Sequence, residues 1–370
     1  MRILHLTSHL RVGGVARSVV TTAACLQRRG HTVAVAAAPG PLQAELSAAN
    51  CAYWPSALGT SAEFSLGVFA ATRQLADRLR KEPFDVLHAH TRTSQVVAAR
   101  LSKKLRVPYV ATWHGFFRPN LGRRFWPCTG DLSIAISPPV AEHLKQDFHV
   151  PENRIRLVPH GIDAGLFAPG GQAERDRLRS DFGLSTQGQV VGTVTRLIRA
   201  RAIDQLLNAW QHLLKAVPGA QLLIVGEGED RERLLALAAT LLQKDRIHFV
   251  PSVNVTREAL AAMDVFVFLP ADKEGFGLVL LEAMAAARPV VAIRRGGGST
   301  WLLDESGVGT QVKAQDPEGL AAAIASILHD PAGAAAMAAQ GLAVVRGRYA
   351  LDGMADKLER VYAEALGRRK

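Results

Sequence analysis

Two glutamates frame a glycine-containing turn in the segment EGFGLVLLEAMAAARPVV, which begins at Glu274. Gly275 and Gly277 open an apolar stretch of helical period, and Glu282 falls within its first turns. A glycine-flanked helix start presents unpaired backbone N–H groups and the positive end of the helix dipole, which together suit a phosphate. An ionised carboxylate only accepts hydrogen bonds, so two of them beside such a turn suit sugar hydroxyls.

A different interpretation places Glu274 on a surface loop and makes Glu282 a partner in a helix ion pair. The apolar neighbours of Glu282 argue against it, because a buried carboxylate needs a polar partner. We therefore favour a functional role for both glutamates.

The elements that must position these residues repeat along the chain. Short runs rich in Val and Ile alternate with longer Ala/Leu-rich stretches of helical period, which is the pattern of βα units around a parallel sheet. Ligands of such sheets bind at the carboxyl ends of the strands. In the first half the predicted strands are Arg2–Ser8, Thr32–Ala38, Val86–His90, Tyr109–Gly115, Ser133–Ser137 and Arg156–Gly161. In the second half they are Val190–Leu197, Gln221–Gly228, Ile247–Val253, Val265–Ala271 and Val290–Gly297.

A glycine- and proline-containing segment, Gly165 to Gly171, separates the two halves. We predict an α/β protein with a first domain at 1–169 and a second at 170–348. A helix at about 349–370 could pack back on the first domain.

Charge is distributed unevenly over the 370 residues. The net charge is +11, and residues 1–165 hold 20 Lys/Arg against 10 Asp/Glu. The stretch from Thr91 to Gly130 has no acidic residue, so an anionic partner is expected for this half. A composition of 48% hydrophobic and 21% charged residues excludes a disordered or fibrous chain. Three cysteines without a CxxC pair argue against a disulfide scaffold and a zinc site.

Aromatic and cationic side chains are interleaved in FFRPNLGRRFWP. This mixture suits the interface of a membrane with anionic lipids, although stacking on nucleic-acid bases or inward packing of the aromatics would also explain it. The residues expected at the membrane are Phe117, Arg118, Arg123, Arg124, Phe125 and Trp126.

The EGFG…LEAMA frame, with two glutamates separated by seven residues, resembles the retaining family-4 glycosyltransferases of the GT-B fold. The resemblance continues through RVGGVARSVV, DVLHAHTR, VATWHGFF, RLVPHGID, GTVTRL and LLIVGEGE. It implies two Rossmann-like domains facing across a cleft, a nucleoside-diphosphate sugar as donor, and retention of the anomeric configuration. Within the family, HAHTR followed by WHGFF is most similar to transferases that build lipopolysaccharide or other envelope glycans.

The resemblance implies that the second domain holds the donor. Glu274 and His114 would contact the transferred sugar as catalytic residues, and Glu282 would hold the ribose hydroxyls. The residues expected at the diphosphate and nucleotide are Arg196, Arg201, Gly226, Gly275, Phe276, Gly277 and Leu278. Two cations there would stabilise the leaving phosphate.

An anionic glycan or glycolipid acceptor would dock on the basic first domain. The implied contacts are Gly14 in the Gly-Gly turn, His90 and Arg92. A glycine in a βα turn and a lone histidine often have only a structural role, whereas the resemblance implies a binding role for Gly14 and His90.

Four positions depart from the family pattern. Arg201 and Ala202 stand in place of a Lys-Gly pair, Thr300 in place of a glutamate, and Ala287 in place of a glycine after the helix. Arg keeps the charge of Lys but has a different shape, so the replacement is not neutral.

No Asp-x-Asp pair follows a strand, so we expect neither a metal nor another cofactor. We also expect no nucleic-acid partner, and a cytoplasmic protein that lies peripherally on the inner membrane surface. The competing interpretations are a GT-B epimerase or phosphorylase, and a non-catalytic protein whose altered site retains only anion binding.

Overall fold

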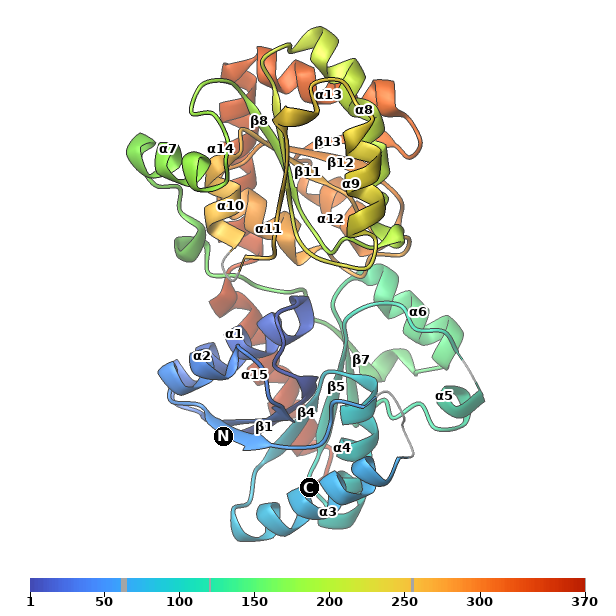
Figure 1. The fold of residues 1–370 in the computed structure, drawn as a ribbon. Helices are drawn as coiled ribbons and strands as arrows, with labels where there is room; N and C mark the ends of the chain where they lie inside the picture. The colour runs from blue at the N-terminus through green and yellow to red at the C-terminus, as the bar shows by residue number, and fades with distance from the viewer. Residues whose placement is uncertain (61–64, 120, 254–255, 370) are drawn as a thin grey trace. The chain divides into compact units, whose positions relative to one another are not determined.

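The computed structural model describes residues 1–60, 65–119, 121–253 and 256–369, and it divides into two compact units. The first unit comprises Met1–Gly161 and Leu351–Lys370, and the second comprises Ile162–Ala350. The final helix, α15 (Leu351–Gly367), therefore belongs with the first unit (Figure 1). The division falls before the predicted boundary at 169/170. The reason is that the Ile162 N–H donates to the Tyr349 carbonyl at 2.9 Å, which joins the two ends of the second unit.

A seven-stranded parallel sheet forms the centre of the first unit, in the order β3-β2-β1-β4-β5-β6-β7. Its strands are β1 (Arg2–His9), β2 (Thr32–Ala38), β3 (Ala52–Pro55), β4 (Val86–Ala89), β5 (Tyr109–Trp113), β6 (Leu132–Ala135) and β7 (Ile155–Leu157). Besides α15, its helices are α1 (Gly14–Arg28), α2 (Gln43–Ala48), α3 (Leu66–Lys81), α4 (Arg92–Leu105), α5 (Leu121–Phe125), α6 (Pro138–Phe148) and the 3₁₀ helix η1 (Glu152–Arg154). The central strands are buried on both faces, which explains their continuous apolar runs.

A capping box fixes the start of α4, directly after β4. The Ser94 hydroxyl accepts hydrogen bonds from the backbone N–H groups of Thr91 at 2.9 Å and His90 at 3.2 Å. The Thr91 side chain in turn accepts a hydrogen bond from the Ser94 backbone N–H, which satisfies a donor of the first helical turn. The capping box also holds the residues after β4 at the carboxyl edge of the sheet.

A six-stranded parallel sheet forms the second unit, in the order β10-β9-β8-β11-β12-β13. Its strands are β8 (Val190–Val194), β9 (Gln221–Val225), β10 (Ile247–Val250), β11 (Val265–Phe268), β12 (Val290–Arg294) and β13 (Thr310–Lys313). Its α-helices are α7 (Gln172–Asp181), α8 (Ile203–Ala216), α9 (Arg231–Ala239), α10 (Thr256–Ala262), α11 (Leu278–Ala285), α12 (Gly297–Ser306), α13 (Pro317–His329) and α14 (Pro331–Arg348). Short 3₁₀ helices lie at η2 (Ala164–Phe167), η3 (Arg199–Arg201) and η4 (Lys244–Arg246).

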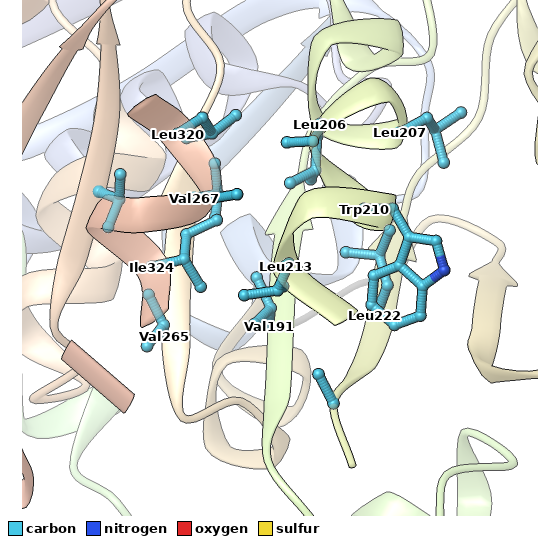
Figure 2. Close-up of a cluster of buried hydrophobic side chains, with 14 of the residues drawn as sticks. Val191, Leu206, Leu207, Trp210, Leu213, Leu222, Val265, Val267, Leu320 and Ile324 are labelled. Atoms are coloured by element: carbon cyan, nitrogen blue, oxygen red, sulfur yellow. The ribbon is translucent and has the colours of Figure 1, made fainter. Parts of the chain in front are cut away.

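Helices α8 and α13, together with α9, cover one face of this second sheet. Figure 2 shows Leu213 of α8 beside Val191 of β8, and Ile324 of α13 beside Val265 of β11. The apolar residues of α8 recur at intervals of three and four, so they form one stripe that faces the strands. Burial of each large aliphatic side chain contributes about 1.5–3 kcal/mol, which makes this layer a firm base for the loops after β8 and β11.

The sequence predicted every strand except β3 and β13, and both of these lie at the edge of a sheet. An edge strand has one neighbour and stays short or polar, as in AYWP and TQVK, so it lacks the long apolar run of a central strand. Several predicted strands end earlier than expected, which leaves His90, His114 and Glu227 in the loops that follow.

No single helix in the described part of the chain has the length and apolarity to span a membrane. The consecutive helices α13 and α14 meet these two criteria together, with a bend of 99° between them.

Two alanines take a left-handed backbone. Ala202 has φ of 47° between η3 and α8, and Ala287 has φ of 50° just after α11. At α11 the Arg288 N–H donates to the Ala283 carbonyl at 2.9 Å, in the helix-end pattern that favours glycine. A residue with a Cβ loses about 1–2 kcal/mol in this conformation. These are the positions where the resemblance implied glycine, so the turns persist without it.

Replacement of Ala287 by glycine is expected to stabilise the second unit. Relief of the left-handed strain exceeds the entropy that glycine adds to the unfolded chain, which leaves a gain of about 0.5–1 kcal/mol. Thermal unfolding should show a Tm higher by about 1–4 °C. The neighbouring Ala286 is a matched control, because its φ of −76° carries no such strain and its side chain is 2% exposed. Ala286→Gly should lower Tm, and a fall for Ala287→Gly as well would contradict the strain argument.

Candidate functional site

An ion pair joins two of the predicted donor residues. The Glu274 carboxylate, in the loop between β11 and α11, accepts a hydrogen bond from the Arg201 guanidinium of η3. The two side chains are only 18% and 17% exposed. The Nε atom of Arg201 is buried without a hydrogen-bond partner in the described part of the structure. An anionic ligand that binds Arg201 would compete with Glu274 and release this carboxylate.

Backbone contacts fix the Glu274 loop. The Gly298 N–H at the start of α12 donates to the Glu274 carbonyl at 2.7 Å. Gly297 is required here, because its φ is +76° and a Cβ would lie 2.5 Å from the same carbonyl oxygen. The position of Glu274 is therefore set by main-chain atoms.

Helix α11 begins as the sequence predicted, after Gly277 in a left-handed conformation with φ of 95°. A Cβ on Gly277 would lie 2.9 Å from the Phe268 ring, so glycine also permits this close packing. Gly275 is buried beside it, and Leu278 is the first helical residue. Phe276 is 2% exposed and packs against the Tyr349 ring at 5.9 Å. The side chain of Phe276 belongs to the core, so only its backbone is available to a ligand.

Glu282 is a buried carboxylate, 8% exposed, as its apolar neighbours predicted. The Thr256 hydroxyl of α10 donates to Glu282 Oε2 at 2.8 Å, which supplies the polar partner that burial demands. Sequence reasoning did not single out Thr256, because nothing in the local pattern links it to a residue on another helix.

The loops after β8 and β9 lie against each other. Gly226 has φ of 151°, and a Cβ there would lie 1.8 Å from the Thr195 carbonyl oxygen. Packing thus explains this glycine without a nucleotide. Arg196, which follows Thr195, has an exposed side chain that forms no hydrogen bond or ion pair within the described residues.

Thr300 contributes to the start of α12. Its hydroxyl accepts a hydrogen bond from the Gly296 N–H at 3.0 Å. The position where the resemblance implied a glutamate therefore carries a neutral capping group.

Buried histidines gather in the first unit. His5 is 0%, His90 5% and His160 8% exposed, and His114 is half-buried. Nδ1 of each ring lies near Nε2 of the next, at 2.9 Å from His5 to His90, 3.2 Å from His90 to His114 and 3.4 Å from His114 to His160. His160 Nδ1 lies 3.0 Å from the Ser18 hydroxyl. We call these five residues the histidine chain.

His88 lies beside the histidine chain, with its ring centroid 4.0 Å from that of His90. Its two nitrogens each form a 2.7 Å hydrogen bond, one with the Tyr362 hydroxyl and one with the Thr112 hydroxyl.

Burial makes these imidazoles hard to protonate. It lowers the pKa of His5 to about 3 and the pKa of His160 to about 4. Burial first and neighbouring imidazoles second hold the pKa values of His88, His90 and His114 well below the usual value. The rings are therefore neutral at physiological pH.

The structure changes the roles predicted for His90 and Arg92. One nitrogen of His90 contacts His5 and the other contacts His114. His90 therefore lies behind His114, and neither of its nitrogens is free to bind the acceptor substrate. The Arg92 guanidinium donates to the backbone carbonyls of Trp126 at 2.8 Å and Pro127 at 2.9 Å. Arg92 therefore holds the segment after α5 in place. Gly14, in contrast, is open, since a Cβ there would meet nothing within 4 Å.

The predicted membrane residues form part of a larger surface. Phe125 is 86% exposed, Arg118 is exposed, and Phe117 and Trp126 are half-buried. Arg123 lies 5.3 Å from the Phe117 ring centroid, and the side chain of Arg124 lies outside the described part of the structure.

Helix α3 adds two residues to this surface, Leu66 at 88% and Phe69 at 52% exposure. Arg100 connects Phe69 to it, since its guanidinium lies 4.0 Å from the Phe69 ring and 5.4 Å from the Trp126 ring. We call Leu66, Phe69, Arg100, Phe125 and Trp126 the aromatic patch. The spacing of Leu66 and Phe69 on one side of a helix was the signal that sequence reasoning missed.

Two parallel-sheet units, with charged side chains at the carboxyl edge of the second, are the architecture of a GT-B glycosyltransferase. The structure of HepE from Anabaena in complex with UDP-glucose has this fold, with a TM-score of 0.85 and 22% identity over 98% of this chain and 100% of that one. The family model of glycosyl transferases group 1 matches residues 174–343, and that of Glycosyltransferase Family 4 matches residues 12–166.

Two relatives carry the name D-inositol 3-phosphate glycosyltransferase. The protein of Acidothermus cellulolyticus is 33% identical over 82% of this chain and 73% of its own length. That of Segniliparus rotundus is 32% identical over 76% of this chain and 66% of its own length. The chain belongs to the group 1 and family 4 glycosyltransferases, and it is a nucleotide-sugar transferase of this family.

Acid is expected to destabilise the first unit through its buried histidines. Each ring binds a proton more readily in the unfolded chain, where its pKa is about 6.5, than in the folded one. The unfolded state therefore gains protons first, and stability falls as the pH drops from about 6.5 toward about 4. Each histidine contributes up to about 1.4 kcal/mol per pH unit to this loss.

Native-state hydrogen exchange can measure the effect in each unit separately, after correction for the intrinsic rate. Amides of β1 and β4 should lose protection between pH 6.5 and pH 5 more steeply than those of β8. The variant His88→Gln should lower this slope, whereas His329→Gln, at the exposed end of α13, should not. An equal loss of protection with falling pH in the two units would contradict the view that the buried histidines make the first unit acid-sensitive.

Proposed function

We propose that this protein is a retaining, metal-independent glycosyltransferase. It moves a sugar from a nucleoside-diphosphate donor on the second unit to an anionic, lipid-linked glycan acceptor on the first. The observation that carries the proposal is the Arg201–Glu274 ion pair beside the start of α11, with Glu282 buried in the same helix.

The donor phosphates bind Arg201 and Arg196 and the backbone N–H groups at the start of α11. A diphosphate bears more charge than one carboxylate, so it displaces Glu274 from Arg201 and leaves that carboxylate to accept a hydrogen bond from a sugar hydroxyl. Glu282 accepts hydrogen bonds from the ribose. The two arginines supply the positive charge that a divalent cation would otherwise provide.

Retention follows if the departing phosphate oxygen takes the proton of the acceptor hydroxyl on the same face of the sugar. The protein then contributes positioning of both substrates and stabilisation of the leaving charge. Arg201 and Arg196 stabilise that charge, and His114 contacts the sugar.

The excess of cations in the first half of the chain supports an anionic acceptor. The names of the two relatives, which include an inositol phosphate, make a soluble phosphorylated polyol the second candidate. A lipid-linked acceptor is favoured by the aromatic patch, since Leu66, Phe69 and Phe125 present apolar surface beside cations. In this proposal the protein lies peripherally on the cytoplasmic face of a membrane.

Nucleotide binding tests the donor site. Thermal unfolding is measured with UDP, GDP, ADP, CMP and their sugar conjugates, each with and without EDTA. One diphosphate class should raise Tm regardless of EDTA, by an amount that corresponds to about 2.7 kcal/mol at a hundred times Kd. Stabilisation by none of them at millimolar concentration would overturn the donor assignment.

Matched variants locate this effect. Glu282→Gln and Arg201→Ala should each remove most of the shift. Glu258→Gln, on the exposed side of α10, and Arg199→Ala, in the same 3₁₀ helix as Arg201, should retain it. A full shift in Glu282→Gln would place the nucleotide elsewhere.

Vesicle sedimentation tests the aromatic patch. The double variant Leu66→Ser and Phe125→Ser should bind vesicles of anionic phospholipid at least tenfold more weakly, because burial of each side chain contributes about 1.5–3 kcal/mol. Leu242→Ser removes a leucine of the second unit that is 67% exposed and serves as the control. Equal binding of both variants, or no binding of the parent protein, would reject membrane contact through this patch.

A further inference from the structure

The histidine chain has one direction. Each of its three contacts between rings joins Nδ1 of one imidazole to Nε2 of the next, from His5 through His90 and His114 to His160. The last Nδ1 meets the Ser18 hydroxyl. The four rings come from different loops and strands, so the fold brings together a sequence of contacts that no local pattern encodes.

Charged groups on the surrounding elements are engaged elsewhere. Arg17 of α1 pairs with Glu45, and Arg92 of α4 binds backbone carbonyls. Glu359 of α15 pairs with Arg29 and His31. The groups that face the histidine chain are the His88 ring of β4 and the hydroxyl of Tyr362, which bond to each other. The histidine chain therefore stays neutral, because among the described residues no carboxylate faces it to compensate an added proton.

Neutrality fixes the positions of the protons. A neutral imidazole has one N–H, and each contact between rings needs one hydrogen, so all four rings must donate in the same direction. Donation from Nε2 would leave the N–H of His5 buried without an acceptor, since His5 Nε2 has no partner within the described structure. Donation from Nδ1 leaves only an unpaired lone pair on His5 Nε2. The last donor, His160 Nδ1–H, then bonds to the Ser18 hydroxyl. A buried unpaired N–H is rarer than an unpaired acceptor, so the Nδ1–H state is favoured.

We propose that His5 and His90 are positioning residues that hold His114 as the neutral Nδ1–H tautomer. His114 then offers an N–H donor to a sugar hydroxyl. The link that such a hydroxyl would replace is the one to His160, which at 3.4 Å is the longest of the chain. The part of this inference that concerns the sugar rests on the proposed function, whereas the tautomer does not.

Three of the imidazoles, His5, His88 and His90, lie close enough together to raise the question of a metal ion. The nitrogens of His88 are both occupied by hydroxyl groups at 2.7 Å. His5 and His90 already bond to each other. A hydrogen-bonded chain accounts for these contacts without an ion, and the experiment below includes zinc as a competing outcome.

Nuclear magnetic resonance of protein labelled with ¹⁵N-histidine tests the inference on the full chain without any ligand. Long-range ¹H–¹⁵N correlations distinguish the two neutral tautomers from imidazolium. We expect His114 to be the Nδ1–H tautomer at pH 7 and to stay neutral at pH 5.5. An Nε2–H tautomer or an imidazolium at pH 7 would overturn the proposal, as would binding of stoichiometric Zn²⁺ to His5, His88 and His90.

Variants of His90 test the positioning role. His90→Leu removes the donor to His114 and should change its tautomer and lower kcat about tenfold, with the KM for the donor changed less than twofold. His90→Asn places an amide N–H near the former Nδ1 and should restore the tautomer and most of kcat, so that a mere packing defect is distinguished. His143→Gln, at a buried histidine outside the chain, should leave the His114 signals unchanged.

The two proposals fail separately. Loss of the nucleotide-induced shift in Tm with an intact Nδ1–H tautomer would reject the donor site and keep the positioning of His114. An unchanged His114 tautomer in folded His90→Leu would reject the positioning role whatever the nucleotide result.

Discussion

Close approach between backbones at the carboxyl edge of the second sheet is the constraint on which the residues proposed to bind the donor depend. Gly228 lets its loop come so near that a Cβ would lie 2.2 Å from the Leu197 carbonyl oxygen. The Leu197 N–H in turn donates to the Glu227 carbonyl at 2.8 Å. Gly297 allows the same proximity to Glu274. Main-chain contacts hold these loops, so the backbone positions of Arg201 and Glu274 are fixed before their side chains pair. Formation of the ion pair therefore costs little additional conformational entropy.

Both units pair charged side chains at their surfaces, and they differ in how they satisfy some of their buried polar groups. The second unit pairs full charges, as with Asp230, where hydrogen bonds from Arg233 hold the pKa of the carboxyl below its usual value. The first unit buries neutral imidazoles that face no carboxylate in the described part of the structure, because a neutral ring needs only one hydrogen-bond donor and one acceptor as partners. Paired charges can exchange partners with an anionic ligand, whereas a neutral hydrogen-bonded chain fixes the direction of each donor.

Sequence patterns predicted what is local and periodic. The central strands follow from their apolar runs, and the turn before α11 follows from its glycines, since both signals lie within a few residues. The edge strands β3 and β13 were missed because they lack such runs. Partners far apart in the chain could not be derived either: Arg201 meets Glu274, and His5 meets His90, across stretches that carry no trace of the contact. The tethering of Arg92 to carbonyls was likewise hidden, because a guanidinium on a predicted strand end looks available for a ligand.

The departures from the family pattern bear on whether the donor site is degenerate. Arg201 keeps the positive charge of the expected lysine and adds a planar fork, so it can contact a carboxylate and a phosphate through different N–H groups. Thr300 replaces a carboxylate by a hydroxyl that accepts the Gly296 N–H, which removes a negative charge near the loop of Glu274. Ala202 and Ala287 retain the left-handed turns that glycine would make. Together these changes preserve the backbone and make the site more positive, which favours binding of a diphosphate and argues against a site that has lost its ligand.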